Sequence, residues 1–404
     1  MNRERAQFVF LNAGHFFDHL TTLVFATAAA LTLSREWGLS YSELIAYATP
    51  GFVAFGVFSL PAGWLADRWS REGMFAVFFV GLGLASIATS FATNPFQIGM
   101  GLFSLGIFAA IYHPVGLALL VQTKPRAGMA IAINGVFGNL GVGSAALITG
   151  YFIDHGGWRA AFVVPGVLSI AFGAAYAFVM RREIAARNMR GVKRVKAADA
   201  RPSLDRATLM RISAIIFFTS AVGGLIFQSV SFALPKILDE RLHGLIGSAT
   251  ALGWLAFCVF AIASLAQLAC GFALDRFQPR TVFLVTSSTQ VAFFALMPGL
   301  FGWSALAVAL AFTIAVFGQV PILDYMIGRM ATGARRAQMY GARYVVTFLV
   351  FAAAVPLLSL IHENWGFDRL FQIMAGGAAL VFCAAALLPG PTQQAEPKAT
   401  LAEA

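Results

Sequence analysis

The sequence predicts an all-α membrane protein whose twelve transmembrane helices form two pseudo-symmetric six-helix bundles. Three observations support this: the chain is strongly apolar, its apolar runs are long enough to cross a bilayer, and one polar motif occurs once in each half. Of the 404 residues, 59% are hydrophobic and 11% are charged, whereas a soluble domain carries roughly a quarter charged residues. A soluble core could not bury this much apolar surface.

The apolar runs define the predicted spans. A helix needs ~20 apolar residues to cross ~30 Å of hydrocarbon, whereas the strands of a membrane barrel would alternate in polarity. The first run follows Arg3 and Arg5 without a small-residue cleavage site, so we expect a retained helix and not a removed signal peptide. The twelve predicted spans cover roughly residues 6–32, 43–66, 73–92, 95–121, 127–153, 159–180, 211–235, 246–274, 280–299, 303–328, 339–361 and 369–389.

The net charge of +10 follows the topology of these spans. If the N-terminus is cytoplasmic, the inside segments hold 22 of the 28 Lys and Arg residues, the outside segments hold five, and Arg343 lies within a span. Basic residues concentrate on the cytoplasmic side of membrane proteins. We therefore expect a multi-pass protein of the cell inner (plasma) membrane with both termini in the cytoplasm, and no nucleic-acid partner.

The polar segments divide the chain into domains. We predict an N-terminal six-helix bundle over residues 1–180, a basic cytoplasmic linker over 181–210, a C-terminal six-helix bundle over 211–389 and a cytoplasmic tail over 390–404. The three cysteines stand singly in apolar spans, without the spacing of a zinc site or a disulfide framework. They are expected to be small core residues.

The duplicated motif relates the two halves. Gly63-Trp-Leu-Ala-Asp67-Arg68 is echoed by Gly271-Phe-Ala-Leu-Asp275-Arg276, and each copy is followed by a further arginine, Arg71 or Arg280. Parallel six-span repeats, related by an axis along the membrane normal, build one large class of transporters.

These motifs resemble the loops between helices 2 and 3 and between helices 8 and 9 of the major facilitator superfamily, and the resemblance covers the whole chain. A closer similarity is to the fosmidomycin-resistance-like branch of drug exporters. It is carried by His15-Phe-Phe-Asp18, by Tyr112-His113-Pro114 and by the glycine-spaced segment Asn134-Gly135-Val-Phe-Gly138-Asn139-Leu-Gly141. The resemblance implies the major facilitator fold and a central cavity lined by helices 1 and 4.

Ionisable side chains inside a bilayer are costly, so each is a functional candidate. His15, Asp18 and His19 occur at i, i+3 and i+4 and share one flank of the first helix. His113 of the fourth span is expected at a similar depth. A carboxyl group and an imidazole can take up a proton on one side and release it on the other, as proton-coupled transport requires. Asn134 and Gln228 are the uncharged candidates for the same cavity.

Two other interpretations of this cluster remain open. Asp18 and the imidazoles can satisfy one another, or Asn134 and Asn139, in a helix-packing network without proton turnover. Metal ligation by two histidines and one carboxylate is a minor alternative. We predict no metal and no cofactor.

Eight residues are gating candidates. The resemblance implies that Asp67 and Asp275 stabilise the outward-facing state by contacting a helix N-terminus of the opposite half, where a carboxylate suits the helix dipole. Asp324 and Arg343 are expected at similar depth and would form an ion pair, either as an inner gate or as a static interhelical contact. The remaining candidates are the motif arginines Arg68, Arg71, Arg276 and Arg280.

The predicted function is secondary active transport, with proton-coupled export of a small drug-like, polar or anionic compound by rocker-switch alternating access. The alternative is proton-coupled uptake of an organic anion or nutrient by symport. A membrane sensor or enzyme is disfavoured because the sequence offers neither a soluble output domain nor a nucleophile with its base. We expect a monomer, with protons, a small-molecule substrate and the lipid bilayer as its partners.

Overall fold

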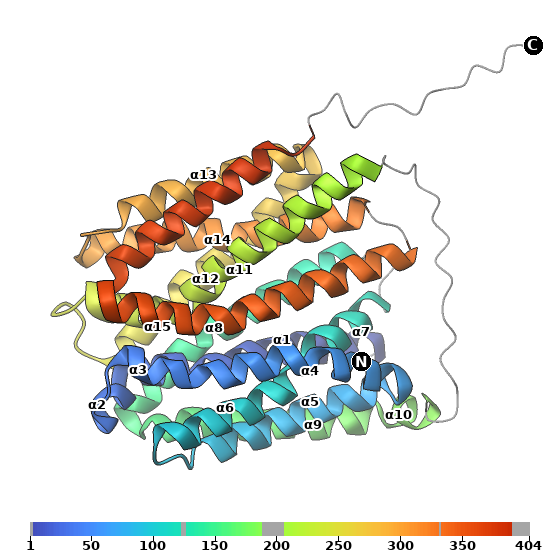
Figure 1. The fold of residues 1–404 in the computed structure, drawn as a ribbon. Coiled ribbons are helices and arrows are strands. Elements are labelled where there is room, and N and C mark those ends of the chain that lie inside the picture. The colour runs from blue at the N-terminus through green and yellow to red at the C-terminus, as the bar shows by residue number, and fades with distance from the viewer. Residues whose placement is uncertain (1–2, 123–126, 188–205, 331–332, 390–404) are drawn as a thin grey trace, which may run out of the picture.

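The computed structural model describes residues 3–122, 127–187, 206–330 and 333–389 and is built from helices (Figure 1). Those of the first half are α1 (Arg3–Ala28), the π-helix η1 (Ala29–Leu33), α2 (Ser34–Trp37), α3 (Tyr41–Ile45), the 3₁₀-helix η2 (Ala46–Ala48), α4 (Thr49–Arg68), α5 (Arg71–Thr89), α6 (Pro95–Ala109), the π-helix η3 (Tyr112–Gly116), α7 (Leu117–Gln122), α8 (Ala127–His155), α9 (Trp158–Val179) and α10 (Arg181–Arg187). Those of the second half are α11 (Arg206–Arg241), α12 (Ala249–Arg276), α13 (Pro279–Leu296), α14 (Gly302–Met330) and α15 (Gly333–Ala386).

Ten helices in the described residues are long and apolar enough to cross a membrane. The number is lower than the predicted twelve for two reasons. Helix α13 is not among the ten, and the segment Val345–Ala386 counts as one helix although the backbone turns at Gly366. Gly366 has φ 69°, a conformation that glycine adopts without the steric cost of a Cβ atom. It therefore divides α15 into the two helices expected near 339–361 and 369–389.

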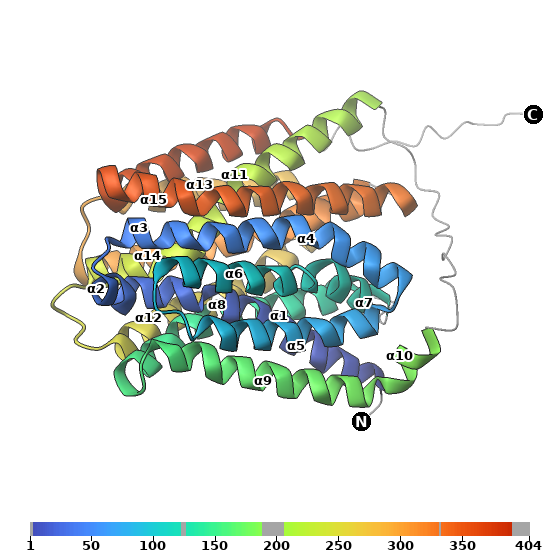
Figure 2. The ribbon, with the colours of Figure 1, turned by 60° about the horizontal axis from the view of Figure 1, so that its bottom comes forward.

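The two halves lie side by side with their long helices roughly parallel. In Figure 1 the helices from α1 to α10 occupy mainly the lower part and those from α11 to α15 mainly the upper part, and Figure 2 shows the same bundle from another direction. We call the end where α10 finishes and α11 begins the linker end, and the opposite end the far end. The all-α fold of two helical bundles is confirmed.

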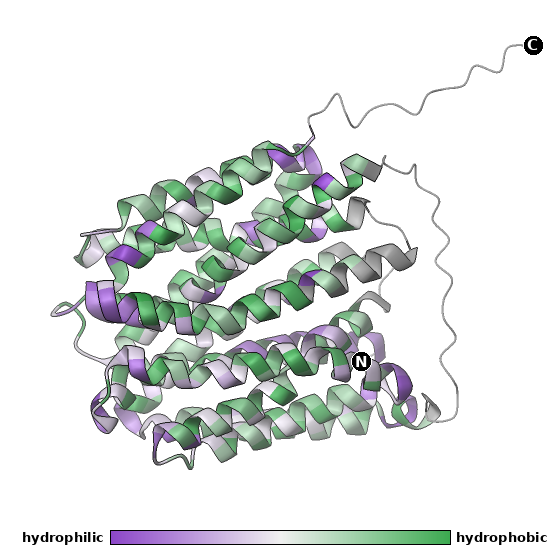
Figure 3. Ribbon diagram, viewed as in Figure 1, coloured by the Kyte–Doolittle hydropathy of each residue, from purple (hydrophilic) through white to green (hydrophobic). Residues whose placement is uncertain are grey.

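The distribution of hydropathy matches a membrane protein. Figure 3 shows apolar residues along the middle of the helices and hydrophilic residues mainly towards their ends. Many large apolar side chains in the middle of the helices are exposed on the outside of the bundle, among them Leu168 (48% exposed) and Leu265 (56% exposed). Lipid tails are the environment that such surfaces require.

The linker differs slightly from the prediction. Helix α10 extends to Arg187, into the segment that was expected to be a polar linker, and α11 begins at Arg206 instead of 211. The rest of the linker and the tail from residue 390 lie outside the described residues. Helix ends vary by a residue or two even between assignments of one structure.

Candidate functional site

A pocket lies between the two halves, lined by residues near the middle of the long helices. It holds about 640 Å³ of empty space, part of it open to solvent. Most of its lining is apolar, and no lysine or arginine occurs among the described residues that form it. The polar lining residues are Asp18, His19, Thr22 and His113 from the first half and Gln228 and Ser231 from the second, and the aromatic ones are Phe52, Phe55, Phe227 and Phe351.

Asp18 is the one carboxylate of this lining in the described chain. Its side chain is 1% exposed, and Oδ2 lies 3.6 Å from Nε2 of His113. The other oxygen, Oδ1, is buried and has no hydrogen-bond partner among the described residues. A buried charge without full compensation is costly, so this position favours the uptake of a proton or of a cationic group.

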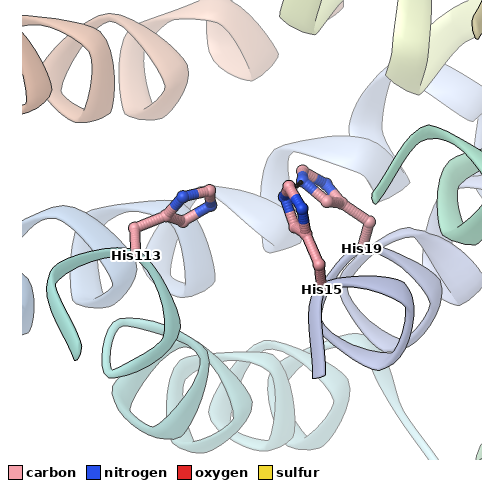
Figure 4. A group of neighbouring side chains, drawn as sticks. All are labelled: His15, His19 and His113. Carbon is pink, nitrogen blue, oxygen red and sulfur yellow. Dashed lines mark hydrogen bonds between the residues drawn. The ribbon is translucent and has the colours of Figure 1, made fainter. Parts of the chain in front are cut away.

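Three imidazoles surround the space next to Asp18. His15 and His19 come from α1, His113 comes from η3, and the rings point towards a common region (Figure 4). Nε2 of His15 and Nε2 of His19 are 3.2 Å apart. One ring nitrogen from each of the three side chains lies within 4.8 Å of the others. The histidines predicted for helices 1 and 4 thus form one cluster, with Asp18 at its edge.

His15 is held from behind by a network of buried polar groups. Its Nδ1 lies 2.7 Å from the backbone oxygen of Asn134, and its ring stacks on Tyr112 with centroids 4.7 Å apart. The Tyr112 hydroxyl donates to Oδ1 of Asn134, and the Asn134 amide donates to Oδ1 of Asn12, each over 3.0 Å. Asn134 and His15 are not among the residues that line the pocket. Asn134 orients the cluster from outside the pocket, which differs from the cavity position expected for it.

The local sequence explains how α1 and η3 present these rings. Pro114 lacks a backbone N–H, and its ring would collide with the carbonyl of Ala110 in a regular α-helix. The chain widens there into the π-helical turn η3, which carries His113. On the other side, Gly138 of α8 leaves room for the His15 ring, because a Cβ atom there would lie 2.6 Å from it.

In the first copy of the duplicated motif, the charged side chains contact residues of the same copy. Asp67 accepts hydrogen bonds from Nε and Nη2 of Arg71 over 3.0 and 2.6 Å, and the guanidinium of Arg68 lies over the Trp64 ring. The contact with a helix of the opposite half, which the family resemblance implied for Asp67, is replaced in this conformation by a contact within the same loop.

The second copy has a different environment. Asp275 and Arg276 are exposed, and the Arg276 guanidinium lies over the Phe272 ring. Arg280 is half-buried, and its Nε has no hydrogen-bond partner in the part of the chain that the structure describes.

Asp324 of α14 and Arg343 of α15 form an ion pair. The Arg343 side chain is 11% exposed and that of Asp324 is 32% exposed. Both belong to the second half, so this pair joins two helices of one bundle and does not bridge the halves.

Among the residues that the structure describes, polar bonds join the two halves at the far end, and none of the residues that form them was a candidate from the sequence. Ser42 of α3 bonds to Nδ1 of His362 in α15 over 2.8 Å, and Nε2 of His362 lies 3.1 Å from a carboxylate oxygen of Glu240. Asp154 of α8 bonds to Thr250 of α12. Asp154 and Glu363 occupy corresponding positions of the two halves in the sequence, 209 residues apart, near this end.

Comparisons with known proteins agree with this architecture. The family model described as Major Facilitator Superfamily matches residues 11–245 and 216–403. The 4-hydroxybenzoate transporter PcaK of Pseudomonas aeruginosa is 23% identical over 419 residues, which covers 94% of this chain and 91% of that protein. A gallate transporter of Pseudomonas putida is 28% identical over 144 residues, or 35% of this chain and 32% of that protein.

A solved structure, described as a D-xylose-proton symporter, superposes with a TM-score of 0.71. It is 13% identical and covers 96% of this chain and 99% of its own. At this identity the likeness concerns the fold alone.

Proposed function

The chain belongs to the Major Facilitator Superfamily, and from that premise we propose that it carries a small aromatic acid together with a proton through the pocket between its halves. It is a multi-pass membrane transporter and not an enzyme. The observation that carries the proposal is the buried carboxylate of Asp18 inside a pocket lined mainly by apolar and aromatic side chains.

The shape and chemistry of the pocket support an aromatic substrate. Phe52 and Phe55 line it from the first half, and Phe227 and Phe351 line it from the second. Ring faces of this kind favour another aromatic ring in stacked or edge-on contact. Gln228 and Ser231 add uncharged hydrogen-bonding groups at one wall. The relatives described above are named as transporters of gallate and of 4-hydroxybenzoate, which both carry a carboxylate on an aromatic ring.

The charge of the pocket links the substrate to the proton. The described lining offers no lysine or arginine to neutralise an anionic substrate, and it contributes the carboxylate of Asp18. Two carboxylates in one poorly hydrated pocket repel each other strongly unless one of them is protonated. A proton on Asp18, or on the neighbouring His113, therefore has to enter with the anion and leave with it. Coupled movement in one direction is symport.

The duplicated loop and the far-end bonds support alternating access. Polar bonds such as that between Ser42 and His362 join the halves at the far end, and Asp67 is bonded to Arg71 of its own half. We therefore expect the linker end to be the end that opens in this conformation. In the opposite conformation Asp67 and Asp275 would contact the other half, and Arg68, Arg71, Arg276 and Arg280 would follow the same movement. We propose that the protein works as a monomer in the inner membrane, with both termini in the cytoplasm.

Proton-coupled export is the second candidate function. Asp18 favours it if the substrate is neutral or cationic. A neutral or cationic compound would replace the proton on Asp18, because the free carboxylate attracts a cation. Proton and substrate would then move in opposite directions. The glycine-spaced helix α8, which resembles that of the fosmidomycin-resistance-like exporters, fits this candidate. The charge of the transported compound thus decides between the two directions.

The test uses the full chain in proteoliposomes with labelled 4-hydroxybenzoate as the probe. Symport predicts accumulation of label when the outside is more acidic than the inside, and loss of that accumulation when a protonophore is added. Asp18→Asn should abolish accumulation driven by the gradient and keep exchange of label across the membrane, because the neutral amide no longer takes up a proton. The matched control is Asp239→Asn, which removes a partly exposed far-end carboxylate paired with Lys236 of the same helix.

Two results would reject the proposal. If Asp18→Asn accumulates label like the wild type, Asp18 is not the coupling group. If 4-hydroxybenzoate is not transported and a labelled organic cation is moved in exchange for protons, the transporter is an antiporter.

A further inference from the structure

We propose that His15, His19 and His113 form a binding site for one divalent transition-metal cation, such as Zn²⁺, at the wall of the pocket. The site goes beyond the proposed transport of an acid and does not depend on it. It rests on the arrangement of three ring nitrogens from two helical segments, η3 and α1, which converge on one space (Figure 4).

Two of the three ring nitrogens are spaced as in a tetrahedral site. A Zn²⁺ ion bound to histidine nitrogens at about 2.0–2.1 Å places two of them roughly 3.3 Å apart. Nε2 of His15 and Nε2 of His19 are 3.2 Å apart. The ring centroid of His113 lies 5.5 Å from that of His15 and 5.9 Å from that of His19, where the same geometry gives roughly 5 Å. The three ring nitrogens lie within 4.8 Å of one another, so His113 has to move towards the two histidines of α1 to complete a three-nitrogen set.

The i and i+4 spacing of His15 and His19 contributes to this geometry. Residues four apart lie on one face of a helix, so both rings leave α1 in the same direction. In the metal-free state the short contact between the two Nε2 atoms requires a proton on one of them. A cation between the rings takes the place of that proton.

His15 has the surroundings of a metal-ligating histidine. A ligating histidine almost always donates its second N–H to a carbonyl or a carboxylate. Nδ1 of His15 lies 2.7 Å from the backbone oxygen of Asn134, which leaves Nε2 available as the ligand. Asp18 lies beside His113, with Oδ2 3.6 Å from Nε2, and its negative charge would partly balance that of the ion.

The donor set and the access route define the class of ion. Imidazole nitrogen suits Zn²⁺, Co²⁺, Ni²⁺ and Cu²⁺, whereas Mg²⁺ and Ca²⁺ require oxygen ligands. His19 and His113 line the pocket, so an ion arriving through it meets two of the three ligands directly. Because two of the three ligands are on the pocket wall, an ion held there would be accessible to water or to an oxygen of the transported compound. Bound metal should therefore inhibit the transport of that compound.

The test measures metal binding by the purified full chain, prepared with an affinity tag that contains no histidine. Titration with Co²⁺ should give the intense visible absorption of a tetrahedral site and saturate at one ion per chain, and Zn²⁺ should abolish that absorption by displacement while Mg²⁺ should not. His15→Gln, His19→Gln and His113→Gln should each weaken Co²⁺ binding by about tenfold or more, since loss of even an outer-shell partner costs about that much.

The matched control is His155→Gln, because His155 is an exposed histidine that bonds to the backbone oxygen of Tyr151 in its own helix. It should bind Co²⁺ like the wild type. If His15→Gln does not give a monodisperse protein, His113→Gln, at the pocket wall, carries the test. An octahedral Co²⁺ spectrum, an equal effect of His155→Gln, or unchanged binding by His113→Gln would overturn the site. None of these results depends on transport activity, so they are independent of the symport proposal.

Discussion

Asp154 of the first half caps the start of a helix in the second half at Thr250. One carboxylate oxygen accepts hydrogen bonds from the backbone N–H and the hydroxyl of Thr250 over 2.7 and 2.6 Å, and the other lies 3.3 Å from the backbone nitrogen of Ala249. The first N–H groups of a helix have no partner within the helix. The contact therefore fastens α8 to α12 at the far end.

Asp154→Ala should weaken closure of the far end. Loss of such a cap costs about 0.5–1 kcal/mol at an exposed position, which shifts the ratio of closed to open far ends by about two- to fivefold. The shift can be measured as a longer distance between spin labels at two exposed far-end positions, Phe91 and Leu245, in a background without the three native cysteines.

Asp239→Ala is the matched control for this measurement. It removes another far-end carboxylate, but one that pairs with Lys236 of its own helix. Its label distances should equal those of the parent protein. Equal distances in Asp154→Ala as well would show that the cap does not contribute to closure.

Much of the candidate site could be predicted from the sequence because it depends on local geometry. The spacing of His15, Asp18 and His19 fixes a common helix face whatever the helix packs against. The depth of His113 follows from counting residues along its span. The glycines of α8 have a spacing that permits close helix packing, and Gly141 lies directly against the backbone of Phe16.

The remaining features depend on packing between distant segments, which a periodic pattern does not encode. Asn134 was expected in the cavity, but Tyr112 and Asn12 hold its side chain in a buried network outside the pocket. The bond between Ser42 and His362 joins residues 320 positions apart. Its formation depends on how the two halves are placed against each other. The kink at Gly366 was foreseen only as a break between two spans.

Gly141→Ala should destabilise the protein. A Cβ atom at Gly141 would lie 2.3 Å from the backbone oxygen of Phe16, so α1 and α8 would have to separate. Overpacking of this kind costs about 1–3 kcal/mol, and a lower melting temperature of the purified protein in detergent measures it. Gly376→Ala is the control, because nothing lies within 4 Å of a Cβ atom there. Alanine is the better helix former by about 0.5–1 kcal/mol, so that variant should melt at the same temperature or higher.

Arg343→Met should destabilise the second half by about 1–2 kcal/mol. The substitution removes the positive charge that contacts the partly buried carboxylate of Asp324, and the cost lies between that of an exposed and that of a fully buried pair. Thermal unfolding in detergent measures the change. The double variant Asp324→Asn with Arg343→Met removes both charges and should recover part of the loss. The single variant Asp324→Asn completes the comparison. If the losses of stability in the two single variants add up to the loss in the double variant, the two side chains do not act as a pair.

Gln228→Leu should change the affinity for substrate without impairing the fold. Gln228 lines the pocket and is 4% exposed, and its Nε2 has no hydrogen-bond partner among the described residues. Replacing an unsatisfied buried amide by an apolar group of similar size does not lower stability, so the melting temperature should stay the same or rise.

The effect on transport separates substrate binding from proton coupling at the same pocket. A substrate that accepts a hydrogen bond from the Gln228 amide loses it in the leucine variant, which should raise KM for 4-hydroxybenzoate by about tenfold, the equivalent of one hydrogen bond to a charged group. Accumulation at saturating substrate should still depend on the proton gradient, because Asp18 and His113 are unchanged.

The control is a glutamine outside the pocket. Gln290→Leu is unsuitable, since that side chain bonds to Gln319 inside the second half. Gln97→Leu at the far end is the control for KM, because the exposed Gln97 side chain lies outside the pocket and accepts hydrogen bonds from the neighbouring Thr93; it should leave KM as it is in the wild type. A Gln228→Leu protein with unaltered KM and a normal melting temperature would place the substrate at another wall of the pocket.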